Sequence, residues 1–237
     1  MPVDDGGWRT VGPSAVAFEG YDEPRAMSVP EVEATVEAFR DAAKRAVEVG
    51  FGVLEIHAAH GYLLHQFLSP LSNTRTDAYG GDLRARARLL LDIVAGIRAD
   101  LPDVALFVRV SATDWTEGGL TVEDVAQVAG WVSEAGADLI DVSTGGNVLA
   151  DIPVGPGYQV PFAEQIRRDA GVAVNAVGII TTGEQAEQVL QEGKADAIML
   201  ARELLRDPHF PLRAAQQLGD EIDYWPTQYE RARPFRF

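Results

Sequence analysis

Two histidines and a tyrosine stand where a short apolar segment gives way to a loop. The segment from Val53 to His57 is rich in β-forming residues, and Gly61 ends it just after His60. We therefore expect both imidazoles and the Tyr62 phenol to cluster at the carboxyl end of a strand. Parallel α/β folds place their chemistry at that end of the sheet.

The histidine pair has alternative interpretations. A His-x-x-His pair can hold zinc, but zinc needs further ligands, and without cysteine these would be carboxylates, His65 or His209. A single histidine at a strand end commonly serves structure alone, and we interpret His65 in that way. Two histidines beside Tyr62 instead make a cluster of hydrogen-bond donors, which favours a catalytic or binding site over a metal site.

Arg109 is unusual because it interrupts an otherwise apolar strand, Leu106 to Ser111. An unpaired guanidinium is costly in a buried strand, so Arg109 requires an anionic or polar partner. One possible partner is an internal carboxylate on a neighbouring strand, Glu55 or Asp141. The other is a bound ligand.

Two further loops have the composition of a phosphate site. Gly178 follows one apolar run, and Ala201 and Arg202 follow the next at the start of a helix. Backbone N–H groups and helix amino termini bind phosphate in such loops. We expect these three residues to do so. The alternative for Arg202 is a surface ion pair with Glu203 or Asp207.

Alternating strands and helices position these residues. We expect strands at residues 53–57, 106–110, 139–143, 172–177 and 197–200. Helices between them end on Gly50, Gly136 and Gly193 and begin at capping boxes Ser28–Glu31, Thr121–Asp124 and Thr181–Glu184. The pattern predicts a parallel sheet covered on its faces. We expect one domain over residues 1–237, with an irregular lead-in at 1–29, β/α units at 30–218 and a tail at 219–237.

Composition narrows the classes of protein. The 237 residues are 46% hydrophobic, which suits one globular domain with a substantial core. The formal charge of −16 opposes binding to nucleic acid or anionic lipid. The sequence has no membrane-spanning run and no signal-peptide pattern at its start, so we expect a cytoplasmic protein. The absence of cysteine excludes disulfides.

One long motif resembles a known family. The run His57-x-x-His60-Gly61-Tyr62 is followed by Ser69-Pro70-Leu71-Ser72-Asn73, Arg75-Thr76-Asp77 and Tyr79-Gly80-Gly81. It resembles the bacterial ene-reductase branch of the Old Yellow Enzyme family. The resemblance implies a TIM (β/α)8 barrel that uses FMN to pass hydride from NADPH to the activated C=C bond of an enone. The five expected strands are similar to the last five of that barrel.

The resemblance also implies roles for individual residues. His57 and His60 would hydrogen-bond the carbonyl or nitro oxygen of the substrate, and Tyr62 would be the proton donor. Arg109 would face the pyrimidine edge of FMN, where its charge stabilises the reduced flavin. Arg231 matches an arginine that reaches a neighbouring subunit's site, which implies a homo-oligomer. A disordered basic end is an equal alternative for Arg231.

The first three barrel strands have no counterpart in this chain. In the family they supply part of the flavin site, so the alternative is a truncated, non-catalytic partial barrel that cannot hold FMN. Strands 53–57 and 197–200 would then be open edges, which promote association. We therefore expect the isolated chain to aggregate or oligomerise, to purify without yellow colour and to show little or no enone reduction.

Overall fold

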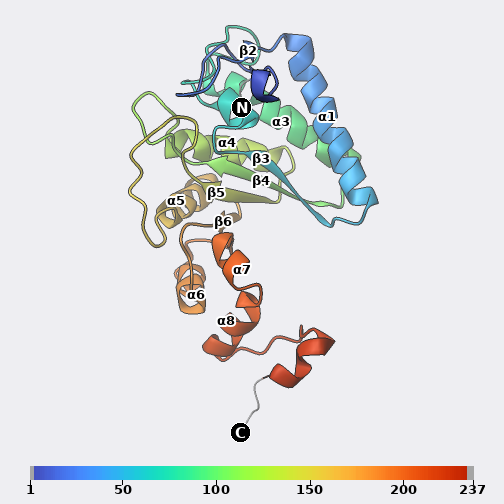
Figure 1. Cartoon of the computed structure of the whole chain (residues 1–237), viewed down its shortest axis with the longest axis vertical. Coiled ribbons are helices and arrows are strands. Elements are labelled where there is room, and N and C mark those ends of the chain that lie inside the picture. The colour runs from blue at the N-terminus through green and yellow to red at the C-terminus, as the bar shows by residue number, and fades with distance from the viewer. Residues whose placement is uncertain (1–2, 234–237) are drawn as a thin grey trace.

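The computed structural model describes residues 3–233 and contains a five-stranded parallel sheet (Figure 1). Its strands are β3 (Val53–Ala58), β4 (Ala105–Ser111), β5 (Leu139–Ser143), β6 (Val174–Ala176) and β7 (Ala197–Ile198). They are neighbours in sequence order, as in successive units of a (β/α)8 barrel. The fold is therefore a partial TIM barrel with five β/α units, as the sequence predicts. Within the described residues, β3 and β7 form the two edges of the sheet.

The last two strands are shorter than the sequence predicts. Strand β6 begins at Val174 and β7 ends at Ile198, although apolar runs extend over 172–177 and 197–200. Strand β7 pairs with only one neighbour, through Asn175 with Ala197 and Ala176 with Ile198. After Ala176 the backbone has other partners, since the Val177 carbonyl accepts from the Gln159 side chain and the Gly178 carbonyl accepts from the Gly157 N–H, so the ladder ends before the apolar run does.

The helices are α1 (Val29–Glu48), α2 (Leu63–Leu68), α3 (Leu83–Asp100), α4 (Val122–Glu134), α5 (Val160–Ala170), α6 (Gly183–Gln191), α7 (Arg202–Arg206) and α8 (Phe210–Leu218). Helix α1 packs on α3, α3 on α4 and α4 on α5, so these four form a continuous layer along the sheet (Figure 1). Between residues 3 and 233, no helix is both long and apolar enough to span a bilayer.

Two of the three predicted capping boxes are confirmed, and the third is replaced by a simple side-chain cap. Ser28 and Thr121 cap α1 and α4 as expected. The cap of α6 is Thr182 instead of Thr181, since the Thr182 hydroxyl accepts a hydrogen bond from the Gln185 N–H at 3.1 Å. The Gln185 side chain accepts from the N–H of Thr181, the residue before the cap, at 3.1 Å, so α6 has a side-chain cap but not the expected reciprocal box.

The two faces of the sheet differ in burial. Side chains that face the helix layer are apolar and fully buried: Leu106 and Val108 are 0% exposed and Val110 is 1% exposed. Alternate positions such as His57 and Arg109 lie on the other face and keep part of their surface accessible. The second face is buried at Asp141 of β5 and Asn175 of β6, so the expectation that both faces are covered holds for these strands and fails toward β3, where His57 is half-buried.

Residues before α1 and after α8 extend the molecule at opposite ends. The lead-in contains the 3-10 helix η1 (Val3–Asp5) and a small parallel pair, β1 (Val11–Gly12) with β2 (Arg25–Ala26). The tail contains the 3-10 helix η2 (Thr227–Ala232). Figure 1 shows the lead-in near α3, whereas the carboxyl-terminal residues, in red, lie beyond α8 and away from the sheet.

Candidate active site

The structure brings His57, His60 and Tyr62 together at the carboxyl end of β3. The His57 ring centroid lies 5.1 Å from that of His60 and 5.4 Å from that of Tyr62. Tyr62 is 62% exposed. Three groups able to donate a hydrogen bond therefore meet at an accessible surface, where the sequence predicts them.

Residues that sequence reasoning assigned no chemical role hold His60 in place. His60 Nε2 lies 2.7 Å from Ser143 Oγ, and Ser143 Oγ lies 3.2 Å from Gln159 Oε1. Ser143 is the last residue of β5, so its position at a parallel strand end was the available signal. The Ser143 hydroxyl donates to Gln159 Oε1, so it accepts from His60 Nε2–H, and Nδ1 is then an acceptor. For Nδ1 to donate to a ligand, Ser143 must turn its proton to Nε2, while Gln159 Oε1 keeps the Thr144 hydroxyl as a donor at 2.8 Å.

Both imidazoles of the pair are kept neutral. Burial lowers the pKa of His60 to about 4, and the nearby charges of Arg109 and His57 act in the same direction. Burial also lowers the pKa of His57, again with help from Arg109. At neutral pH each ring therefore offers one N–H donor and bears no charge.

Arg109 pairs with a carboxylate on the neighbouring strand. Its Nε lies 3.0 Å from Asp141 Oδ2, and the Asp141 side chain is 0% exposed. Of the two carboxylates that the sequence offered, Asp141 is the one in contact. Burial raises the pKa of Asp141 to about 7, although the Arg109 charge opposes this rise and Glu55 reinforces it.

The Arg109 guanidinium retains free donors. Its Nη1 lies 3.5 Å from Met199 Sδ, a weak acceptor, and it has no oxygen acceptor besides Asp141 among residues 3–233. The internal ion pair and ligand contact, which the sequence presented as alternatives, are thus compatible. One edge of the guanidinium pairs with Asp141 while the rest remains available to a bound molecule.

A cavity of about 350 Å³ joins the predicted residues of several strands. Its walls include His60, Arg109, Gly178, Ala201 and Arg202. The volume lies at the lower end of the range for small-molecule sites, about 300–1,000 Å³. His57 and Tyr62 are not among its lining residues; the His57 ring contacts that of His60, and the Tyr62 ring contacts that of His57.

The two loops that we expect to bind phosphate contribute Gly178, Ala201 and Arg202 to the walls of the cavity. Gly178 has φ +135°, and a Cβ there would lie 3.3 Å from Gln159 Cβ, so glycine fits this approach. Arg202 is exposed and forms no hydrogen bond or ion pair with other residues in the range 3–233. Its predicted surface partners are engaged elsewhere, since Glu203 pairs with Arg206 and Asp207 with Arg213.

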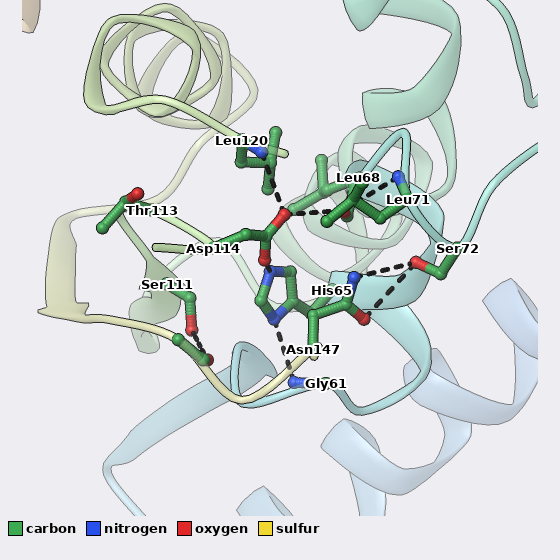
Figure 2. A network of polar contacts seen from close by, with 12 residues as sticks. Gly61, His65, Leu68, Leu71, Ser72, Ser111, Thr113, Asp114, Leu120 and Asn147 are labelled. Carbon is green, nitrogen blue, oxygen red and sulfur yellow. Dashed lines mark hydrogen bonds and ion pairs between the residues drawn. The ribbon is translucent and has the colours of Figure 1, made fainter. Parts of the chain in front are cut away.

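The remaining predicted residues lie outside the cavity. Arg231 is exposed in η2, in the tail that lies away from the sheet in Figure 1. His65, which we interpreted as structural, is 0% exposed and lies 3.0 Å from the equally buried Asp114 (Figure 2). Sequence reasoning did not anticipate Asp114 as its partner. Across residues 3–233, no group of three or more His, Asp or Glu side chains is arranged to hold a metal ion.

Comparisons with known proteins match almost the whole chain. Residues 9–221 match the NADH:flavin oxidoreductase / NADH oxidase family. An NADPH dehydrogenase of Bacillus subtilis (strain 168) is 54% identical over 220 residues, which cover 92% of this chain and 64% of the relative. An NADPH dehydrogenase of Geobacillus thermodenitrificans is 51% identical over 226 residues, 95% of this chain and 66% of the relative.

A solved structure agrees with this assignment. Morphinone reductase in complex with tetrahydroNAD superposes with a TM-score of 0.73 at 27% identity, covering 94% of this chain and 63% of that one. The chain therefore belongs to the NADH:flavin oxidoreductase / NADH oxidase family. It spans about 65% of the length of the curated relatives that it matches.

Proposed function

We propose that this chain carries the substrate-binding and phosphate-binding parts of an FMN-dependent ene-reductase, which passes hydride from NADPH to the activated C=C bond of an α,β-unsaturated carbonyl compound. The cavity carries this proposal, because it joins His60 and Arg109 to the two phosphate loops in a single space. Similarity to proteins named NADPH dehydrogenase supports the choice of reductant.

The residues present fit FMN. Arg202, free of protein partners in the described range, and the backbone N–H groups near Gly178 and Ala201 would hold the phosphate. The free donors of Arg109 would face the electron-rich edge of the flavin ring. FMN, when bound, supplies the capacity to accept a hydride from one substrate and give it to another.

The histidine pair would activate the alkene. Neutral N–H groups of His57 and His60 would donate hydrogen bonds to the substrate carbonyl oxygen and draw electron density from the β-carbon. The charge that develops on that oxygen during reduction strengthens these bonds, so they assist the reaction more than they assist binding. The exposed Tyr62 phenol would then protonate the α-carbon.

Assembly and location are further parts of the proposal. Arg231 lies in η2, in the tail that Figure 1 shows away from the sheet, and it does not line the cavity, which favours its approach to the site of a second copy in a homo-oligomer. A cytoplasmic location, and the absence of nucleic-acid and membrane partners, stay predictions from composition.

Paired titrations with FMN and riboflavin test the phosphate end of the site. The 237-residue chain should prefer FMN, which carries the phosphate, and Arg202→Ala should weaken FMN binding by about 1.5–3 kcal/mol, the worth of a charge-assisted hydrogen bond. Riboflavin affinity should stay unchanged. Arg168→Ala is the matched control, because Arg168 is exposed and pairs only with the adjacent Asp169.

Two outcomes would contradict the proposal. Equal affinities for FMN and riboflavin would remove the phosphate role from these loops. If neither molecule binds, the chain acts as the non-catalytic partial barrel that the sequence offered as the alternative.

A further inference from the structure

The backbone of His60 is held in an uncommon conformation. Its φ of +58° lies in the left-handed region, which costs a non-glycine residue on the order of 1 kcal/mol or more. Such a conformation persists only when its surroundings enforce it. The N–H of His60 donates to Ser111 Oγ at 3.0 Å, and the next N–H, that of Gly61, donates to His65 Nδ1 at 2.9 Å.

The Gly61 contact defines the protonation of His65. Because a backbone N–H can only donate, His65 Nδ1 must carry the lone pair, and the proton of the neutral ring must sit on Nε2. Nε2 lies 3.0 Å from Asp114 Oδ1, so its N–H faces that carboxylate in a close polar contact that is not aligned as a hydrogen bond. Figure 2 shows the ring bridging Gly61 and Asp114.

Asp114 is itself fixed by donors on its second oxygen. Oδ2 accepts from Ser69 Oγ at 2.6 Å and from the Leu120 N–H at 2.9 Å. Burial acts to raise the pKa of Asp114, but the contact with His65 and the hydrogen bonds from Ser69 and Leu120 outweigh it and lower that pKa. The carboxylate is therefore charged, and its orientation leaves Oδ1 facing the imidazole.

We propose that His65 and Asp114 are positioning residues, which hold the Gly61 peptide and thereby keep His60 in the conformation that presents its ring to the cavity. Neither side chain touches the cavity, since both are 0% exposed. This inference rests on the proposed function for the role of His60, but the protonation state of His65 does not depend on it.

The substitution Asp114→Asn gives a sharp test. The Asn oxygen should take the Oδ2 place, where two donors point, which turns the amide NH2 toward His65. His65 Nε2 would then have to accept, so its proton would move to Nδ1 and face the Gly61 N–H, donor against donor. The substitution keeps the shape of the side chain but should reverse the tautomer of His65.

Imidazole ¹⁵N NMR of the labelled 237-residue chain reads this directly, because only four histidines contribute. In the wild type, we expect the proton of His65 on Nε2. In Asp114→Asn, we expect either the His65 proton on Nδ1 or the loss of the hydrogen bond from the Gly61 N–H to His65. In both cases the NMR signals of the His60 ring and of the Gly61 amide should shift. Asp92→Asn is the control, since the Asp92 side chain is 44% exposed and lies 3.7 Å from Arg88, far from complete burial as in Asp114.

A second pair of variants separates the two contacts of His65 if Asp114→Asn fails to fold. His65→Asn can keep an acceptor near the Nδ1 position and should preserve the His60 signals. His65→Gln places its amide near the Nε2 position and leaves the Gly61 N–H without its acceptor, so the wild-type His60 signals should be lost. A wild-type His65 proton on Nδ1, or unchanged His60 signals in both Asp114→Asn and His65→Gln, would overturn the proposal. Failure of flavin to bind would leave these readings intact and count only against the proposed function.

Discussion

His60 and His65 are five residues apart in the chain but occupy opposite kinds of environment. His65 is fully buried, and each ring nitrogen has a protein partner. His60 lines an open cavity, and within residues 3–233 only its Nε2 has a hydrogen-bond partner. The difference shows that a free hydrogen-bonding position at an accessible surface, and not residue type, separates a histidine suited to binding from one that supports structure.

Gly61 connects the two environments. Its N–H bonds to His65, and its backbone lies against that of Gly146 so closely that a Cβ would come 2.1 Å from the Gly146 carbonyl oxygen. A displacement of the buried His65–Asp114 pair would therefore shift the Gly61 peptide and, with it, the adjacent His60. Substitutions on either side of this glycine test whether the buried His65 and the accessible His60 differ in this way.

The largest effect should come from Asp114→Ala. Removing the carboxylate leaves the donors of His65, Ser69 and Leu120 without an acceptor in a dry site, and the loss of one partner from a buried pair costs about 3–5 kcal/mol of unfolding free energy. Urea unfolding measures this. Asp92→Ala, which breaks an exposed pair at 3.7 Å, should cost less than about 1 kcal/mol. Equal losses of unfolding free energy in Asp114→Ala and Asp92→Ala would contradict the description of the His65–Asp114 pair as buried.

Gly61→Ala should rank second. Alanine is strained at φ +73° by about 1–2 kcal/mol, and the contact with Gly146 adds about 1–3 kcal/mol of overpacking. Gly81→Ala is the matched control, because Gly81 has φ +89° and open space around its Cβ position. The difference in unfolding free energy between the two variants isolates the close approach. No difference would show that the loops separate freely.

Substitution on the open side should affect ligand binding more than stability. We expect His60→Ala to weaken binding of a phenolic carbonyl compound to the flavin-loaded protein by about 1.5–3 kcal/mol, the worth of a hydrogen bond to a charged oxygen. Its unfolding free energy should change less than in Asp114→Ala, because the site is partly solvated. Titration and urea unfolding of the same samples check both. Unchanged affinity would remove His60 from substrate binding.

The smallest effect should be a change in the pH dependence of stability. The pKa of His60 in the folded protein, about 4, is below its ordinary value of 6.5, so its neutral form favours folding. This contribution is complete above pH 6.5 and is lost as the pH falls toward 4. Asp141, with its pKa raised to about 7, acts in the opposite direction, losing stability as pH rises. His60→Gln removes the His60 contribution, so the unfolding free energy of the variant should increase less between pH 4 and pH 6.5 than that of the wild type. If the wild type loses stability over this range because of Asp141, the variant should lose more. Identical slopes in both proteins would contradict the lowered pKa.

Sequence determined the order of the elements and where the site lies. Apolar runs, Gly50 and Gly136 at positive φ, and the caps at Ser28 and Thr121 are local signals, so they predicted the positions of the five strands and both limits of α1 and α4. Parallel strands place their carboxyl ends at one edge, which allowed residues far apart in the chain to be assigned to one site.

Tertiary structure alone decided which partners each side chain has. The pairing of Arg109 with Asp141 and not Glu55 depends on strand register, and the contacts of His65 with Asp114 and of His60 with Ser143 join different β/α units. Propensities and motifs describe neighbours along the chain, whereas these contacts depend on how loops from separate strands pack. For that reason the sequence could point to the histidines as candidates, but only the folded chain shows that His65 is buried against Asp114 while His60 lines an accessible cavity.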